Sequence, residues 1–308
     1  MKNIVLGLAM LVSLTMIGCC DTPTKKGDLH IYTVDNTDGK ITAKMLEAAI
    51  EAAGFRVGLN SDIDDGLTQM FKEDYFKLYS TISIYHEKLS MDILKVNPDA
   101  GVFLPMGLAI YQTHADNNVH IAVVTAAAQA KIAGGDEAVY TALETAIAKM
   151  IIEFVPKAKH SYNNEGLKET RTLLTKFSLD LKGADWEEAK EALEENFEEQ
   201  FDKAGYLMPS YFDLTDELGE NSPYDFYITY SICKIDVIRS IAKVNPEAAA
   251  FAPCTTMMYK RKDEDKITMG FTAVYNWLSS ANITDKESVE GLLKAQKEFE
   301  DILIDVTK

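Results

Sequence analysis

Two hydrophobic periodicities alternate along this chain. Apolar residues occupy every second position over 224–233, and over 76–85 with Ser80 as the exception, which is typical of β-strands. Over 186–203, apolar residues instead recur at three- and four-residue intervals, as on one face of an α-helix. Strands that alternate with helices, together with one hairpin in each half, predict sheets that carry helices on one face.

A similar sequence pattern occurs twice along the chain. The stretch "KVNPDAGVFLPMGLAIYQ" begins at Lys95, and "KVNPEAAAFAPCTTMMYK" begins at Lys243. The segments before them align without a gap, from "YFKLYSTISIYHEKLSMDIL" at Tyr75 against "PYDFYITYSICKIDVIRSIA" at Pro223. We therefore predict a duplicated domain, because a chain of this length suits two ordinary domains.

Each half is predicted to hold a strand, a long helix, a strand, a short acidic helical turn, a longer strand, a helix, a hairpin and a terminal helix. In the first half these are 30–34, 41–53, 55–60, 64–73, 76–85, 87–96, 102–112 with 119–126, and 136–154. In the second half they are 176–182, 186–203, 206–212, 214–219, 224–233, 235–244, 250–260 with 267–275, and 285–305. The predicted fold class is α+β: two repeated two-layer domains, each a mixed or antiparallel sheet with helices on one face, related by a pseudo-two-fold axis.

Helix-end signals support these boundaries. Gly54 and Gly205 follow the first long helix of each half and suit the left-handed residue that ends a helix. Asp185, followed by Glu188, has the spacing of a helix N-cap with its partner. We expect both helices to be amphipathic and to cover a sheet.

The N-terminal segment predicts export. A single Lys2 precedes an apolar run from Ile4 to Ile17, which is too short to span a bilayer. The run ends in Met16-Ile17-Gly18-Cys19, which resembles a bacterial lipoprotein signal with Cys19 as the lipidated residue. Cys20 is the alternative lipidation site, and an ordinary secretory signal is the alternative to lipidation.

The predicted organisation follows from this signal and the repeat. It comprises a signal and lipidation site (1–19), a tether (20–28), a first domain (29–155), a linker (156–170) and a second domain (171–308). The expected location is the bacterial cell envelope, with the chain lipid-anchored, facing the periplasm, and a monomer that forms an internal pseudo-dimer.

The net charge limits the kinds of molecule that this chain is expected to bind. The net charge is −17, and it becomes −18 once residues 1–18 are removed, because Lys2 is the charged residue lost. An acidic chain without a basic stripe is a poor candidate for nucleic acid. A small ligand or a basic periplasmic protein remains compatible with the charge.

The repeated motif order resembles a known family. In each half an Ala-Gly-aromatic helix end precedes a strand, a helix that ends in Asn-Pro, and an apolar strand that contains Pro. This order resembles domain-of-unknown-function family 302 (DUF302), once per half, and implies small α+β domains without an established activity. The family form carries two cysteines, which match Cys233 and the Pro253-Cys254 pair, whereas the first half has Tyr85 and Pro105-Met106 instead.

The two cysteines are the first candidate site. Strand alternation places Cys233 opposite the apolar row that we predict to share one face: Tyr224, Phe226, Ile228, Tyr230 and Ile232. Cys254 aligns with Met106, in a row that we predict to face the core. Three states stay open: buried structural thiols, a disulfide, and a redox or metal-binding pair. Met257, Met258 and Met269 would join the metal-binding version, although the adjacent pair points to opposite faces.

The second candidate is a polar trio that recurs in both halves. It consists of Tyr79, Thr81 and Ser83, repeated as Tyr227, Thr229 and Ser231. These hydroxyls predict either a groove for a small ligand or a seam between the halves; a plain half-exposed strand is the alternative.

We recognise no catalytic motif in the sequence. The five histidines are scattered along the chain, at His30, His86, His114, His120 and His160. No base accompanies the serines of the trio, and no Gly-rich phosphate loop occurs. We therefore expect no cofactor, no metal and no enzymatic activity, and predict a ligand- or partner-binding accessory lipoprotein. A thiol-dependent redox or metal-binding protein is the alternative.

Overall fold

The computed structural model describes residues 27–163, 166–168 and 171–308. The predicted signal, the lipidation site at Cys19 and most of the tether lie outside the described residues. Within the described ranges, no helix combines the length and the apolar character needed to cross a membrane.

The first half forms a six-stranded antiparallel sheet in the order β2-β3-β4-β5-β1-β6. Its elements are β1 (Leu29–Asp35), α1 (Ala43–Ala52), β2 (Arg56–Asp62), α2 (Ile63–Phe71), β3 (Phe76–Tyr85), α3 (Glu87–Val96), η1 (Pro98–Phe103), β4 (Met106–Thr113), β5 (Asn118–Val124), α4 (Ala126–Ala133), α5 (Glu137–Phe154) and β6 (Lys159–Tyr162).

The second half forms a five-stranded antiparallel sheet in the order β7-β11-β10-β9-β8. Its elements are β7 (Leu174–Asp180), α6 (Trp186–Lys203), β8 (Leu207–Asp213), α7 (Thr215–Leu218), β9 (Tyr224–Cys233), α8 (Ile235–Ala242), η2 (Pro246–Phe251), β10 (Cys254–Arg261), β11 (Lys266–Thr272), α9 (Tyr275–Ser280) and α10 (Lys286–Val306). Apart from β6, the strand order repeats that of the first half.

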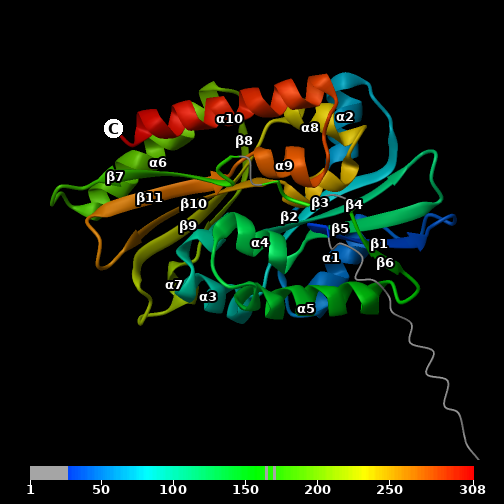
Figure 1. Ribbon diagram of the computed structural model, residues 1–308, viewed down its shortest axis with the longest axis horizontal. Coiled ribbons are helices and arrows are strands. Elements are labelled where there is room, and N and C mark those ends of the chain that lie inside the picture. The colour runs from blue at the N-terminus through cyan, green and yellow to red at the C-terminus, as the bar shows by residue number, and fades with distance from the viewer. Residues whose placement is uncertain (1–26, 164–165, 169–170) are drawn as a thin grey trace, which may run out of the picture.

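The long helices lie on two outer sides of the molecule (Figure 1). In Figure 1, α6 and α10 run along one outer side of the molecule, α1, α3 and α5 run along the opposite side, and the strands lie between them. Each sheet therefore carries helices on one face and turns its other face toward the opposite half. The predicted α+β class with two helix-covered sheets is confirmed.

The capping signals work as predicted. The Asp185 carboxylate accepts from the backbone N–H groups of Glu187 and Glu188 at the start of α6. Gly54 and Gly205 have φ angles of +85° and +77°, which end the helices before β2 and β8. Leu193, Phe197 and Phe201 form the buried stripe of α6.

Some segments differ from the predicted elements. The hairpins begin later than 102 and 250, because the residues from Pro98 and from Pro246 form the 3₁₀ helices η1 and η2. Three short elements escaped prediction, namely α4, α9 and β6, since each spans only a few residues. Strand β6 lies inside the predicted linker 156–170 and pairs with β1.

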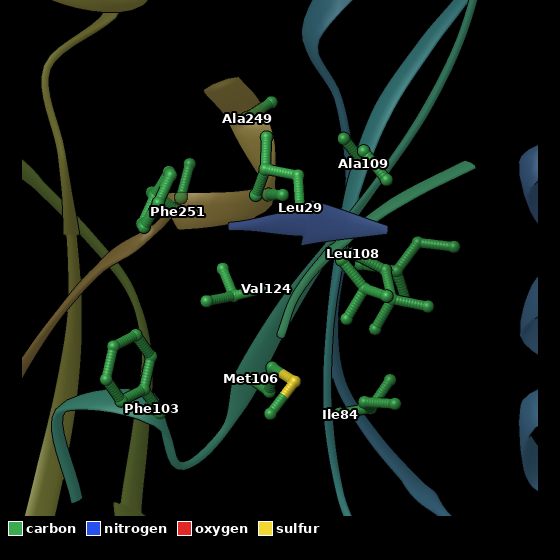
Figure 2. Close-up of a cluster of buried hydrophobic side chains, with 14 of the residues drawn as sticks. Leu29, Ile84, Phe103, Met106, Leu108, Ala109, Val124, Ala249 and Phe251 are labelled. Atoms are coloured by element: carbon green, nitrogen blue, oxygen red, sulfur yellow. The ribbon is translucent and has the colours of Figure 1, made fainter. Parts of the chain in front are cut away.

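One hydrophobic cluster spans both halves. Figure 2 shows Phe103, Met106 and Leu108 of the first half in the same group of buried side chains as Ala249 and Phe251 of η2. Burial of a side chain such as Phe251 contributes roughly 1.5–3 kcal/mol. The halves therefore share a core, in addition to the separate cluster between α6, α10 and the second sheet.

Candidate functional site

The polar trios lie at the contact between the halves. The exposed fraction is at most 4% for each of the six side chains, which are Tyr79, Thr81, Ser83, Tyr227, Thr229 and Ser231. The alternatives predicted for them were a ligand groove, a seam between the halves and a plain half-exposed strand. The structure favours the seam, because Tyr79, Thr81 and Tyr227 bond to backbone carbonyls of the opposite half.

Two tyrosine hydroxyls make reciprocal contacts across this seam. The Tyr79 hydroxyl donates to the carbonyl of Pro246 at 3.2 Å, and the Tyr227 hydroxyl donates to the carbonyl of Pro98 at 2.5 Å. Each 3₁₀ helix thus rests on the sheet of the other half. Burial raises the pKa of both tyrosines far above its ordinary value, so the hydroxyls stay protonated donors.

The remaining seam residues are not symmetric. The Thr81 hydroxyl donates to the carbonyl of Ala252 at 3.0 Å, whereas the hydroxyl of its counterpart Thr229 has no partner among the described residues. Ser231 bonds to Ser210 at 2.7 Å. The backbones of the two halves therefore meet with pseudo-two-fold symmetry, but the equivalent polar side chains do not make equivalent hydrogen bonds.

One part of the predicted apolar row is wrong. Phe226, Ile228, Tyr230 and Ile232 belong to the helix-covered core, but Tyr224 turns toward the first half, where its hydroxyl donates to the carbonyl of Leu94 at 2.6 Å. The reason is a register shift between Lys260 and Arg261 on the neighbouring strand, which breaks the strict alternation.

Both cysteines line one apolar pocket in the second half. Cys254 is the first residue of β10 and pairs with Ile232 on β9. Cys233 follows Ile232 in the sequence, so it lies diagonally across the strand pair from Cys254. Both are free thiols of intermediate exposure. The pocket is bounded by the ends of β9 and β10, by β11, and by α8, α9 and α10; its wall includes Tyr206, Val237, Ile238, Pro253, Phe271, Trp277, Leu292 and Phe299.

The pocket is small. Its volume is about 40 Å³, measured as the space open to the centre of a water-sized sphere. In the first half, Met106 and Tyr85 occupy the positions equivalent to Cys254 and Cys233, and their side chains are 1% and 6% exposed. Larger side chains thus occupy in one half the positions where the other half has thiols.

Several polar side chains lie at the pocket wall. The Lys234 ammonium donates to the carbonyl of Ala204 and to the carboxylate of Glu298, both at 2.9 Å. Gln296 accepts from the backbone N–H of Val274 at 2.9 Å. The Trp277 side chain is buried, and its indole N–H meets no acceptor in the described part of the chain. Sequence reasoning missed this indole because the short helix α9 gave no periodic signal.

The surroundings of the thiols suppress their reactivity. Burial raises the pKa of Cys233 to about 11. Burial, and then the neighbouring Cys233, raise the pKa of Cys254 to about 12. Because the thiolate is the nucleophile and the metal ligand, both groups are poor nucleophiles at neutral pH.

The methionines do not assemble around the cysteines. Met257 belongs to the cluster shared between the halves, whereas Met258 and Met269 belong to the helix-covered core, as alternation predicts. Over the described ranges, no group of three or more His, Cys, Asp or Glu side chains is arranged to hold a metal ion. Two of the scattered histidines do meet, however: the rings of His30 and His160 lie 5.1 Å apart.

These features define an α+β protein of two facing antiparallel sheets, with an apolar pocket in its second half. The family described as "Domain of unknown function DUF302" matches residues 30–154. The first half is therefore a DUF302 domain, as the motif order predicted.

Among solved structures, the chain is similar to the uncharacterized conserved protein DUF302 from Bacillus stearothermophilus, known from a crystal structure. The sequence identity is 16% and the TM-score is 0.36, and the similarity covers 45% of this chain and 100% of the other. No curated protein matches the chain.

Proposed function

We propose that this chain is a lipid-anchored bacterial lipoprotein of the periplasmic side that binds a small apolar ligand without transforming it. In this proposal the second half is a second DUF302-like domain, and its pocket is the binding site. The acidic surface would favour a basic periplasmic protein as the partner that delivers or receives the ligand.

The reciprocity of the two halves supports the tandem arrangement. Strands β8-β9-β10-β11-β7 repeat the order β2-β3-β4-β5-β1. Helix η1 contacts β10 and β11 of the other half, and η2 contacts β4 and β5 in return. A sequence profile built from relatives of residues 171–308 should therefore match DUF302; a match to an unrelated family would contradict the tandem arrangement.

One observation carries the binding proposal: in a mostly apolar pocket, the Trp277 indole N–H has no partner among the described residues, and burying such a donor is costly. A ligand that offers an apolar body and one hydrogen-bond acceptor would fill the space and satisfy Trp277.

Two substitutions at one position test the pocket. Cys254→Met introduces the side chain of the first half and is expected to fill the space, whereas Cys254→Ala keeps it open. We expect native mass spectrometry of residues 21–308, exported to a periplasm, to show a non-covalent adduct in the original chain and in Cys254→Ala but not in Cys254→Met. An adduct that survives in Cys254→Met would place the ligand elsewhere.

A separate experiment tests the anchor. An alkyne-bearing fatty acid supplied to the producing cells should label the chain, and the label should be lost in Cys19→Ala and retained in Cys20→Ala. Label that persists in Cys19→Ala would move the lipidation site to Cys20. An unlabelled original chain would contradict the lipoprotein proposal.

A thiol-dependent redox role is the second candidate, because Cys233 and Cys254 share one pocket. Cys254 faces Ile232 across about 5 Å, and Cys233 lies one residue further along the strand. Their Cα atoms are then roughly 6 Å apart, within the range of a disulfide, although strand alternation points the two side chains to opposite faces of the sheet. An intact mass that rises by about two hydrogens on reduction would favour this role, and two freely alkylated thiols before reduction would exclude it.

A further inference from the structure

Two histidines and a glutamate form a hydrogen-bonded chain at the edge of the first sheet. Nδ1 of His30, on β1, lies 2.9 Å from Nε2 of His160, on β6. Nε2 of His30 lies 2.8 Å from Oε1 of Glu144, on α5. Pairing of β6 with β1 brings the two histidines together although they are 130 positions apart in sequence.

Glu144 determines which nitrogen of His30 carries the proton. Its Oε1 atom also accepts from the backbone N–H of Ala126, at 2.7 Å, at the start of α4. A carboxylate oxygen can only accept, so Nε2 of His30 must be the protonated nitrogen. The lone pair of Nδ1 is therefore directed at Nε2 of His160.

The surrounding residues hold these two imidazoles in place. His30 is buried, at 7% exposure, whereas His160 is exposed. The Tyr162 ring lies 5.0 Å from the His30 ring and 4.9 Å from the His160 ring, and Tyr32 lies 4.8 Å from His160. The His30 imidazole is thus fixed, and the His160 imidazole is accessible from solvent.

Two converging imidazole nitrogens can share either a proton or a metal ion. Zn²⁺ binds imidazole at about 2.0–2.1 Å, so two nitrogens in a tetrahedral arrangement lie roughly 3.3 Å apart. From the observed 2.9 Å, the nitrogens must separate by about 0.4 Å, and the exposed His160 ring must turn so that both lone pairs converge on the ion. The bond from Glu144 to the outer nitrogen of His30 is the carboxylate–histidine arrangement that orients metal ligands.

We propose that Nδ1 of His30 and Nε2 of His160 form a site for a divalent transition-metal ion that favours imidazole, such as Zn²⁺. Solvent completes the coordination, and Glu144 positions His30 from the second layer. The site is independent of the pocket in the second half, since it is built from β1, β6 and α5 alone.

Zn²⁺ titration by calorimetry tests the site. The experiment uses the full chain in detergent solution, with millimolar Mg²⁺ present to occupy surface carboxylates. We expect one equivalent of Zn²⁺ to bind at micromolar concentration. His160→Ala should weaken this binding at least tenfold, and Glu144→Gln should weaken it about 10- to 100-fold. The matched controls His114→Ala and Cys254→Ser should bind like the original chain.

Three outcomes would overturn the proposal. Equal binding by the original chain and His160→Ala would place the ion elsewhere, and loss of binding in Cys254→Ser would assign it to the thiols. No binding up to about 100 μM would mean that the two imidazoles share only a proton. Because a folding defect would confound His160→Ala, its far-UV circular dichroism is compared first, and Co²⁺ absorption of the original chain reports imidazole ligation independently.

Discussion

Loss of a single hydroxyl at the seam should destabilise both halves of the protein together. In Tyr79→Phe the ring keeps its packing, but the hydrogen bond from its hydroxyl to the carbonyl of Pro246 in the second half is lost. Tyr79 is 2% exposed, so water cannot easily replace the missing partner. The perturbation is therefore a hydrogen bond removed between two halves and nothing else.

The magnitude follows from the burial. A typical intramolecular hydrogen bond contributes about 0.5–1.5 kcal/mol to stability. The urea dependence of unfolding grows with the surface exposed, and we take roughly 3 kcal/mol per molar for a chain of this size. The urea midpoint should then fall by about 0.2–0.5 M.

The positions of the tryptophans make the assay informative. Both Trp186 and Trp277 lie in the second half, whereas Tyr79 lies in the first. Tryptophan fluorescence therefore reports the second half, and far-UV circular dichroism reports both. Because one hydrophobic cluster spans the halves, we expect the two signals to change together and to shift equally in Tyr79→Phe.

A fluorescence transition that stays in place while the circular dichroism transition moves would refute this reasoning, because the halves would then unfold independently. Tyr211→Phe is the matched control. The Tyr211 side chain is 46% exposed, so the loss of its hydroxyl should change the midpoint by less than about 0.2 M.

Three further predictions concern single side chains. Burial raises the pKa of Glu247 above its ordinary value of 4.5. The protonated side chain therefore contributes its full stability below pH 4.5, and this stability is lost as the pH rises through the folded-state pKa. Glu247→Gln should raise the melting temperature at pH 7 but not at pH 4. Thr81→Val should lower the urea midpoint by the equivalent of about 1–2 kcal/mol, whereas Thr229→Val should leave it unchanged or raise it, because only Thr81 has an acceptor. Iodoacetamide should alkylate Cys233 at pH 8 about tenfold or more slowly than a free thiol, and faster toward pH 11, as followed by intact mass.

Each of these predictions has a result that contradicts it. A stability gain for Glu247→Gln that is the same at both pH values would mean that ionisation is not the cause. Equal losses in Thr81→Val and Thr229→Val would show that packing, not the hydrogen bond, determines the effect. Alkylation of Cys233 as fast as that of a free thiol would mean that the pocket opens on the timescale of the reaction.

The sequence predicted the main elements of both halves because each is encoded locally. The alternation over 224–233, the spacing over 186–203, and the cap at Asp185 require no knowledge of distant residues. The family of the first half followed from the order of the motifs. Short elements such as β6 were missed, since four residues carry too little periodicity to be recognised.

The sites depended on contacts that no local pattern contains. Sequence periodicity marked Tyr79 and Tyr227 as one face of a strand, but only the packing of the halves decided that this face is buried. Alternation separated Cys233 from Cys254, yet the ends of β9 and β10 bring both to one pocket. His30 and His160 looked scattered because an antiparallel edge pair joins positions that are distant in sequence. Local patterns thus determined the strands and helices, and long-range packing, which depends on which faces bury each other, determined where chemistry is possible.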